Sequence, residues 1–129
     1  MLTELYTLIC QRLQEAGFAA WAADCVPDWS GFPFVTFSIE PAAAYGGTGA
    51  LQVTLWQRDD APHADRLAAE EKLMGFIPAP GLLLPLTGGA ALATRSAAHS
   101  LTRQRKSGAV ASTLRCTLTT FPERSDPDA

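Results

Sequence analysis

The sequence predicts an α+β fold: about four mainly antiparallel strands, with an N-terminal helix and a second helix packed on one face of the sheet. Two segments of the 129-residue chain repeat their apolar residues at helical spacing, and the others alternate apolar and polar residues as strands do. The content of 47% hydrophobic and 18% charged residues is typical of one globular domain. We therefore expect a single domain over residues 1–121 and a flexible polar tail over residues 122–129.

At the N-terminus, the spacing predicts a helix that Thr3 caps and that runs to about Ala16, where Gly17 ends it. Its apolar stripe consists of Leu2, Leu5, Ile9, Leu13 and Ala16. Residues 18–33 mix turn formers with tryptophan and valine, which predicts an ordered connection packed on the core. Residues 34–39 then alternate and predict the first strand. Its core-facing residues are Val35, Phe37 and Ile39.

The strongest local pattern is a strand that leads directly into a helix, within residues 49–77. Alternation over residues 51–58 predicts a strand with one buried face. That face consists of Leu51, Val53 and Leu55. Trp56 falls on the opposite face, so its ring must be covered by a helix or must contact another subunit.

The acidic turn after this strand predicts a helix cap rather than a catalytic pair. Asp59 and Asp60 supply N-cap oxygens, and Pro62 suits the first turn, where its missing N–H costs no hydrogen bond. The helix should run from His63 to Met74. Its predicted apolar stripe consists of Leu67, Ala68 and Met74.

Two further strands are predicted after the second helix. Proline and glycine punctuate an apolar connection, in which residues 82–86 must be packed. Residues 92–104 predict the third strand. Ser107 and Gly108 form a turn, and alternation over residues 110–119 predicts a long final strand.

Residues with catalytic or metal-binding chemistry form no recognisable constellation. His63 and His99 lack an acidic pair at ligand spacing. The glycines of residues 46–49 lead into a strand and lack a following lysine, which excludes a P-loop. No serine lies in a Gly-x-Ser-x-Gly context, and no cysteine has a local partner that would lower its pKa. We therefore expect no enzyme activity, no metal and no cofactor.

Cysteine usage and hydropathy indicate a soluble, intracellular protein without membrane contact. Cys10, Cys25 and Cys116 stand far apart and are odd in number, which favours free thiols in a reducing compartment. Met1 leads straight into the first helix, without the pattern of a signal peptide. No apolar run is long enough to span a bilayer.

Basic residues are segregated in the sequence. The net charge is −3, but residues 73–122 contain five basic residues and no acidic residue. These bases are Arg95, Arg103, Arg105, Lys106 and Arg115. The even spacing of the first three places them on one face of an unbulged strand, with Lys106 in the turn and Arg115 on the polar face of the partner strand. Such bases can face an anionic partner, keep the surface soluble, or pair with acids such as Glu40 or Asp65 of a neighbouring subunit.

Three segments, taken with the order of elements, are similar to a known family. They are Phe32-Pro33-Phe34-Val35-Thr36-Phe37, the strand end Trp56-Gln57-Arg58-Asp59, and the helix from His63 to Met74. The pattern resembles the tail terminator and related head-to-tail joining proteins of long-tailed bacteriophages and prophages, also described as minor capsid or tail completion proteins. The resemblance covers residues 1–121. The Pro-rich residues 78–85 depart from the family pattern, which leaves the packing of the last hairpin open.

The resemblance implies a structural virion assembly protein. Its subunits would form a homo-oligomeric ring, commonly a hexamer, that caps the tail tube and joins tail to head. The implied partners are further copies, the tail tube protein, head-tail connector proteins and, transiently, the passing DNA. The implied location is the tail-head junction of the virion, after assembly in the host cytoplasm. We expect Tyr45, Gly46, Gly47 and Trp56 at the subunit interface, and the five bases at the lumen or an interface.

Two segments should order on assembly. The Gly-rich residues 42–49 and the hairpin tip 104–108 have little to bury, so an isolated subunit should leave them mobile.

Three other functions stay open. One alternative function is a head-side stopper or adaptor of the connector. Another is a small nucleic-acid-binding module, which the bases favour although aromatic residues are not interleaved with them. An enzyme of unknown type ranks third.

Overall fold

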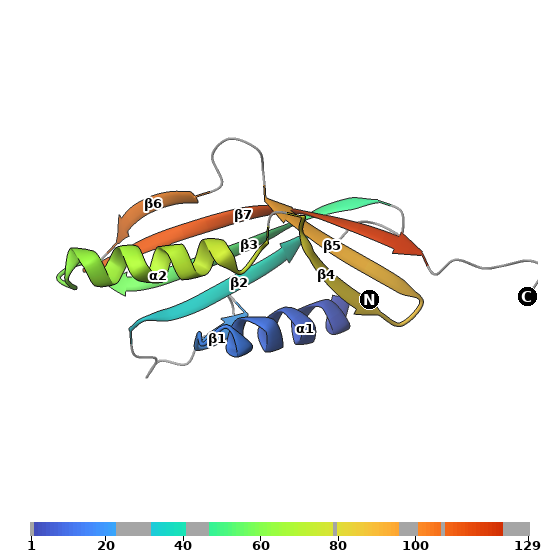
Figure 1. Cartoon of the computed structure of the whole chain (residues 1–129), viewed down its shortest axis with the longest axis horizontal. Coiled ribbons are helices and arrows are strands. Elements are labelled where there is room, and N and C mark those ends of the chain that lie inside the picture. The colour runs from blue at the N-terminus through green and yellow to red at the C-terminus, as the bar shows by residue number, and fades with distance from the viewer. Residues whose placement is uncertain are drawn as a thin grey trace, which may run out of the picture.

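The computed structural model describes residues 2–22, 32–40, 47–78, 80–95, 101–106 and 108–122. In chain order the elements are α1 (Leu2–Glu15), β1 (Ala20–Ala22), β2 (Phe34–Glu40), β3 (Thr48–Arg58), α2 (His63–Gly75), β4 (Leu82–Leu86), β5 (Gly89–Arg95), β6 (Leu101–Lys106) and β7 (Ala109–Pro122). Figure 1 shows one curled sheet with both helices on the same side. The predicted α+β class is confirmed, but this part of the chain forms seven strands rather than about four.

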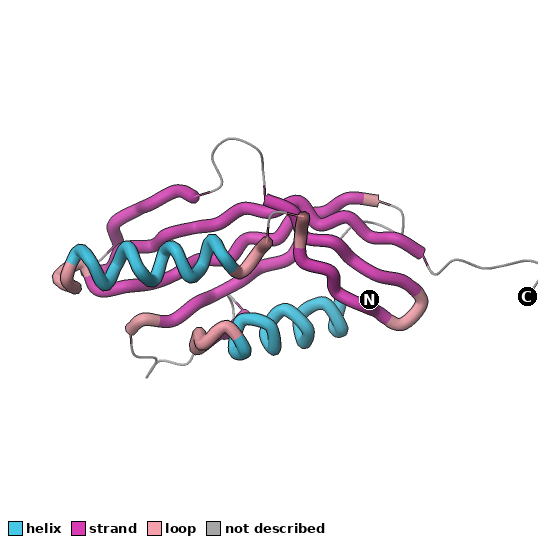
Figure 2. The backbone as a smooth tube through the Cα atoms, viewed as in Figure 1, coloured by secondary structure: helices cyan, strands magenta, loops and turns pink. Residues whose placement is uncertain are grey.

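The sheet is built around its two longest strands, β3 and β7. The strand order is β1-β2-β3-β7-β5-β4, and β6 also pairs with β7. β1 is parallel to β2, and the other pairs are antiparallel. β6 pairs with residues 109–114 of β7 and β5 with residues 116–122, so these two strands follow one another along the same edge of β7 (Figure 2). The predicted third strand is therefore two strands, of which β5 begins earlier.

The helix side of the sheet carries the hydrophobic core. Alternate residues of β2 and β3 face it, and all six that the sequence assigned to the core are buried. They are Val35, Phe37, Ile39, Leu51, Val53 and Leu55. Residues 82–86, predicted as a connection, form strand β4 instead, because Leu84 packs into the core while its neighbours pair with β5.

Helix α1 packs on the apolar face of the sheet as predicted, apart from its first turn. Leu5, Ile9 and Leu13 are fully buried, and the Tyr6 ring lies 5.5 Å from that of Phe37, centroid to centroid. Gly17 ends the helix with a positive φ of 94°, which glycine adopts without steric cost. Two details are wrong: Thr3 lies inside the helix rather than at its cap, and Leu2 is exposed.

Helix α2 packs through a different stripe from the predicted one. Leu67 is 40% exposed, Ala68 is exposed and Met74 is half-buried. The buried residues recur every three to four positions instead, at Glu70, Leu73, Phe76 and Ile77. This rotation buries Leu73, Phe76 and Ile77 and brings the Glu70 carboxylate into the interface, where residues of β6 and β7 bind it.

The start of α2 also differs from the prediction. Pro62 occupies the N-cap position and no side chain caps the helix. Asp60 is bound locally, because the Arg58 guanidinium donates hydrogen bonds to both of its carboxylate oxygens, at 3.1 and 3.3 Å. The Asp59 N–H donates to the Gly108 carbonyl oxygen at 3.0 Å, which ties the end of β3 to the turn before β7.

Several sequence predictions concern residues outside the described ranges. Within residues 18–33, β1 is described, and residues 23–31 lie outside. Residues 42–46 of the Gly-rich segment, Ser107 of the hairpin tip and residues 123–129 of the tail also lie outside. Neither described helix combines the length and the hydropathy needed to cross a membrane.

Candidate functional site

The sheet has one face that neither described helix covers, here called the open face. It lies opposite α1 and α2 (Figure 1) and carries the residues that alternate with the core positions of each strand. Its middle is polar: Thr36 lies opposite Thr54, which lies opposite Thr113. The Thr54 and Thr113 hydroxyls are 3.1 Å apart, at hydrogen-bonding distance. A ladder of polar residues thus crosses the centre of the open face.

Four aromatic rings lie at one end of the sheet, here called the aromatic corner. Trp21, Phe34 and Trp56 are on the open face, and Phe32 is at its edge, where it also lines a cavity with Asp65 and Ala69 of α2. Phe34 is central: its ring stacks on Trp56 at 6.1 Å, meets Trp21 edge-on at 6.1 Å, and lies 5.4 Å from Phe32, all between centroids. The Trp56 Nε1–H donates to Thr36 Oγ1 at 2.9 Å. The polar edge of the indole is therefore satisfied, and Phe32 remains 45% exposed.

The other end of the open face carries a second apolar cluster, here called the distal patch. It comprises Leu83, Leu92 and Phe121. Leu83 lies opposite Leu92 in the β4–β5 pair, and the exposed fractions of Leu83 and Phe121 are 59% and 46%. The register sets Trp56 opposite Ala111 of β7, ten residues before Phe121. At about 3.3 Å per residue, the two apolar ends lie about 30 Å apart along β7.

The predicted interface residues fall in different places. Trp56 belongs to the aromatic corner, where the register places it on the open face and Phe34 covers one side of its ring. Tyr45 and Gly46 lie outside the described residues. The Gly47 carbonyl oxygen accepts hydrogen bonds from the N–H of Thr120 at 3.0 Å and from its hydroxyl at 3.2 Å. Gly47 is thus joined to β7 within the subunit.

The five predicted basic residues are divided between the two faces. Arg95, Arg103 and Arg105 lie opposite core-facing residues of β7, so the register places all three on the helix side. They do not share one strand as the even spacing assumed, because Arg95 ends β5 and the other two belong to β6. Arg115 lies opposite Gln52 and belongs to the open face. Lys106 pairs through its backbone with Ala109, and its side chain lies outside the described part.

Arg103 is engaged within the subunit. Its Nε–H and Nη2–H donate to the two carboxylate oxygens of Glu70 at 2.6 and 2.7 Å, and the Ser112 hydroxyl donates to Glu70 at 2.6 Å. The Arg103 hydrogen bonds, the Ser112 hydroxyl and the positive charges of Arg103 and Arg66 hold the Glu70 pKa below its usual value, against the effect of burial. Sequence reasoning missed this cluster, although Glu70 precedes Leu73 and Ile77 at helical spacing.

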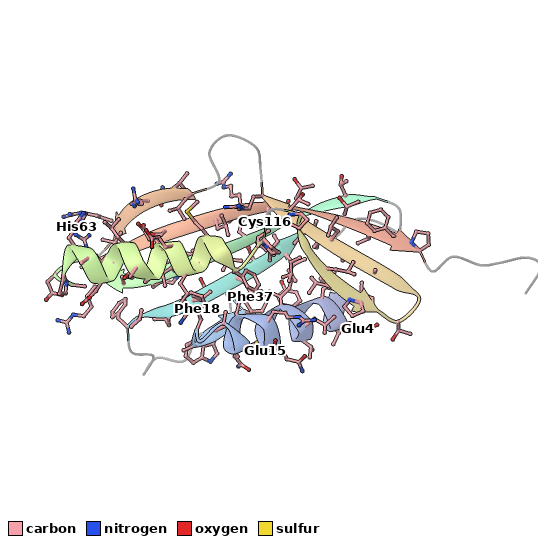
Figure 3. The ribbon with its side chains drawn as sticks, in the orientation of Figure 1. Glu4, Glu15, Phe18, Phe37, His63 and Cys116 are labelled. Carbon is pink, nitrogen blue, oxygen red and sulfur yellow. The ribbon has the colours of Figure 1, made fainter. Side chains whose placement is uncertain are left out.

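The remaining reactive groups that the structure describes lie apart from one another. Burial raises the pKa of the Cys116 thiol to about 11. The Glu4 carboxylate lies near the turn between β4 and β5 (Figure 3), where it accepts a hydrogen bond from the Thr87 N–H at 2.9 Å that lowers its pKa. Among the residues that the structure describes, no three His, Cys, Asp or Glu side chains are grouped to hold a metal ion.

Comparison of the sequence with protein-family models and with curated proteins found no match. The open face combines an apolar cluster at each end with a polar centre.

Proposed function

We propose that this protein is a structural assembly subunit that forms a homo-oligomeric ring, of the tail-terminator kind that caps a tail tube and joins it to the head. The observation that carries the proposal is the open face, which is apolar at both ends and covered by neither described helix. Isolated exposed leucines are normal on protein surfaces. Exposed apolar residues gathered on one face instead mark a protein contact.

The arrangement of the two apolar ends favours a ring. In a ring with rotational symmetry, each subunit offers two different surfaces, one to each neighbour. The aromatic corner and the distal patch differ in shape and lie about 30 Å apart along β7. Two separate patches allow each subunit to bind one neighbour at each end, which a single self-complementary patch would not do.

The distribution of charge favours a protein partner over nucleic acid at this face. Among the strand arginines, the register assigns Arg95, Arg103 and Arg105 to the helix side and Arg58 and Arg115 to the open face. The charge of Arg58 is paired locally with Asp60. In the aromatic corner, Phe34 and Trp56 stack on each other, so each ring has one face already occupied. A single-strand binding surface would combine free ring faces with several cations.

Oligomeric state tests the proposal. We expect light scattering coupled to size exclusion, together with native mass spectrometry, to find a concentration-dependent hexamer. Replacing Leu83 and Phe121 together by serine should shift the equilibrium to the monomer, because both side chains are exposed and their loss leaves the core intact. The matched control is Leu2→Ser, which removes an exposed leucine from α1 on the other side of the sheet.

The control decides which surface acts. Dissociation by the double variant with an intact hexamer for Leu2→Ser supports the open face. Equal weakening by both would assign the effect to general surface hydrophobicity. A wild-type chain that stays monomeric at all concentrations, even when mixed with purified tail tubes, would contradict the ring. Binding to a head connector but not to tail tubes would assign the subunit to the stopper role.

A further inference from the structure

A cavity of about 210 Å³ lies on the helix side of the sheet, between α2 and strands β3, β6 and β7. Its lining includes His63, Arg66, Leu67, Glu70, Arg103 and Val110. His63 marks the N-terminal end of α2 in Figure 3. The cavity therefore lies beside the first two turns of the helix, away from the open face.

Arg66 brings a buried donor to this cavity. Its Nε atom is buried and has no hydrogen-bond partner among the described residues. The backbone of Arg66 is fixed at both ends: its N–H donates to the Pro62 carbonyl oxygen at 3.0 Å, and its carbonyl oxygen accepts a hydrogen bond from Gln57 Nε2 at 3.2 Å. A buried donor that lacks a partner costs free energy, so a group that accepts its hydrogen bond would be bound favourably.

The acid that lines the cavity does not meet this need. Glu70 accepts two hydrogen bonds from Arg103 and one from Ser112. No hydrogen bond joins Glu70 to the Arg66 side chain. With one carboxylate and two guanidinium groups among its described lining residues, the cavity has a surplus of positive charge. Leu67 and Val110 add apolar walls beside these charges.

We propose that this cavity binds a carboxylate carried on a short aliphatic stem, as in a glutamate side chain of a partner protein. The carboxylate would pair with the Arg66 guanidinium, and a turn of that side chain toward the cavity would give its buried Nε–H the acceptor it lacks. The methylene groups of the stem would contact Leu67 and Val110. The positive charge accounts for the anionic head, the apolar walls account for the stem, and the volume suits one side chain. Binding at this cavity does not require the subunits to form a ring. The cavity also lies away from the open face, which carries the proposed assembly.

A titration followed by amide NMR tests the site on the full chain. The probe is N-acetyl-glutamate N-methylamide, and the matched neutral probe is N-acetyl-glutamine N-methylamide. We expect the glutamate probe to shift the amides of Gln57, Arg66 and Val110 at constant ionic strength. The glutamine probe should bind at least tenfold more weakly, because it lacks the charge that Arg66 would pair with.

Three variants separate the site from general electrostatics. Arg66→Met should weaken glutamate binding at least tenfold. Arg105→Met removes an exposed cation that lies opposite Val110 but does not line the cavity, so it should weaken binding far less, through charge alone. Leu67→Trp changes an exposed position and should block the cavity without unfolding the chain. Thermal melting of each variant establishes that it is folded, and Leu67→Trp carries the test if Arg66→Met does not fold.

Four outcomes would overturn the proposal. They are equal binding of the glutamine probe, undiminished binding by Arg66→Met or by Leu67→Trp, equal loss of binding in Arg105→Met, and tighter binding of inorganic phosphate than of the glutamate probe. The last result would assign the cavity to a free oxyanion. None of these results depends on whether the chain forms a ring.

Discussion

Glu70 of α2 and Arg103 of β6 form a two-pronged ion pair, with donor–acceptor distances of 2.6 and 2.7 Å. The exposed fractions of the two side chains differ greatly, at 7% for Glu70 and 59% for Arg103. The pair joins a helix to a strand that contributes little to the core. Because one partner is buried and the other is largely solvated, the two residues should respond differently to mutation.

Arg103→Gln should destabilise the fold more than Glu70→Gln. Removing the arginine leaves a buried carboxylate with Ser112 as its remaining hydrogen-bond donor, and solvent screening reduces the cost to about 2 kcal/mol. Removing the Glu70 charge frees an arginine that water can solvate, so that change should cost about 1 kcal/mol. Urea denaturation of both variants and of the double variant measures these values. Equal costs would mean that Glu70 is hydrated in solution.

The stability of the wild-type chain should fall in acid partly through Glu70. The folded state lowers the pKa of this carboxyl, so the folded chain binds its proton less readily than the unfolded chain does. The resulting stabilisation is fully present above the unfolded value of about 4.3 and is lost as the pH falls through the lower folded value. Melting temperatures from pH 7 to pH 2 should show the difference between wild type and Glu70→Gln shrinking below about pH 4. A constant difference would contradict the pKa shift.

The sequence predicts those elements whose pattern is local. Helix α1 and strands β2 and β3 follow their own periodicity, so their boundaries and buried faces agree closely with the structure. The orientation of α2 depends on Arg103, which lies 33 residues from Glu70 in the sequence. A single-sequence pattern treats Glu70 as a surface residue and therefore selects the wrong stripe.

The candidate site could be predicted only in part. Alternation places Trp56 on the face away from the core. Which rings surround it depends on the register between β2 and β3. The position of the Trp21 ring also depends on the register between β1 and β2. The distal patch requires knowledge that residues 82–86 form a strand, because only then does Leu83 face away from Leu84. Pro85 and the apolar run obscured that strand.

Two leucines of α2 provide a direct test of its orientation. Leu73 is fully buried, and Leu67 is on the exposed side of the helix. Leu73→Ala should lower the free energy of unfolding by about 2–5 kcal/mol, as large-to-small core changes do. Leu67→Ala should change it by less than about 1 kcal/mol. Chemical denaturation measures both, and a larger effect at Leu67 would restore the predicted stripe.

Cys116 should be nearly unreactive in the folded chain. Burial raises its pKa to about 11, so the nucleophilic thiolate is scarce at neutral pH. Cys10 is partly exposed and should react faster. Iodoacetamide labelling at neutral pH, followed by peptide mass spectrometry, compares the two sites. Labelling of Cys116 as fast as Cys10 in native protein would show that β7 opens readily, and labelling in urea provides the fully accessible reference.

The arginines on the helix side would face the lumen of the proposed ring if that side turns inward. Arg103 binds Glu70, so neutralising it would combine a loss of stability with a loss of charge. Arg95 and Arg105 are exposed. The informative change is therefore Arg95→Gln with Arg105→Gln, which should leave the melting temperature nearly unchanged.

A ring repeats each subunit's charges around its lumen, so this double variant would remove two of the three helix-side arginines from every subunit of the collar. We expect the variant to assemble normally, to bind DNA more weakly and to show a smaller dependence of binding on salt, because fewer counterions are released from phosphates. The matched control is Arg115→Gln, a neutralised arginine on the open face. Unchanged DNA binding by the double variant, or an equal loss in the control, would exclude the helix side from the lumen. Failure of the double variant to form rings would assign Arg95 and Arg105 to the subunit interface.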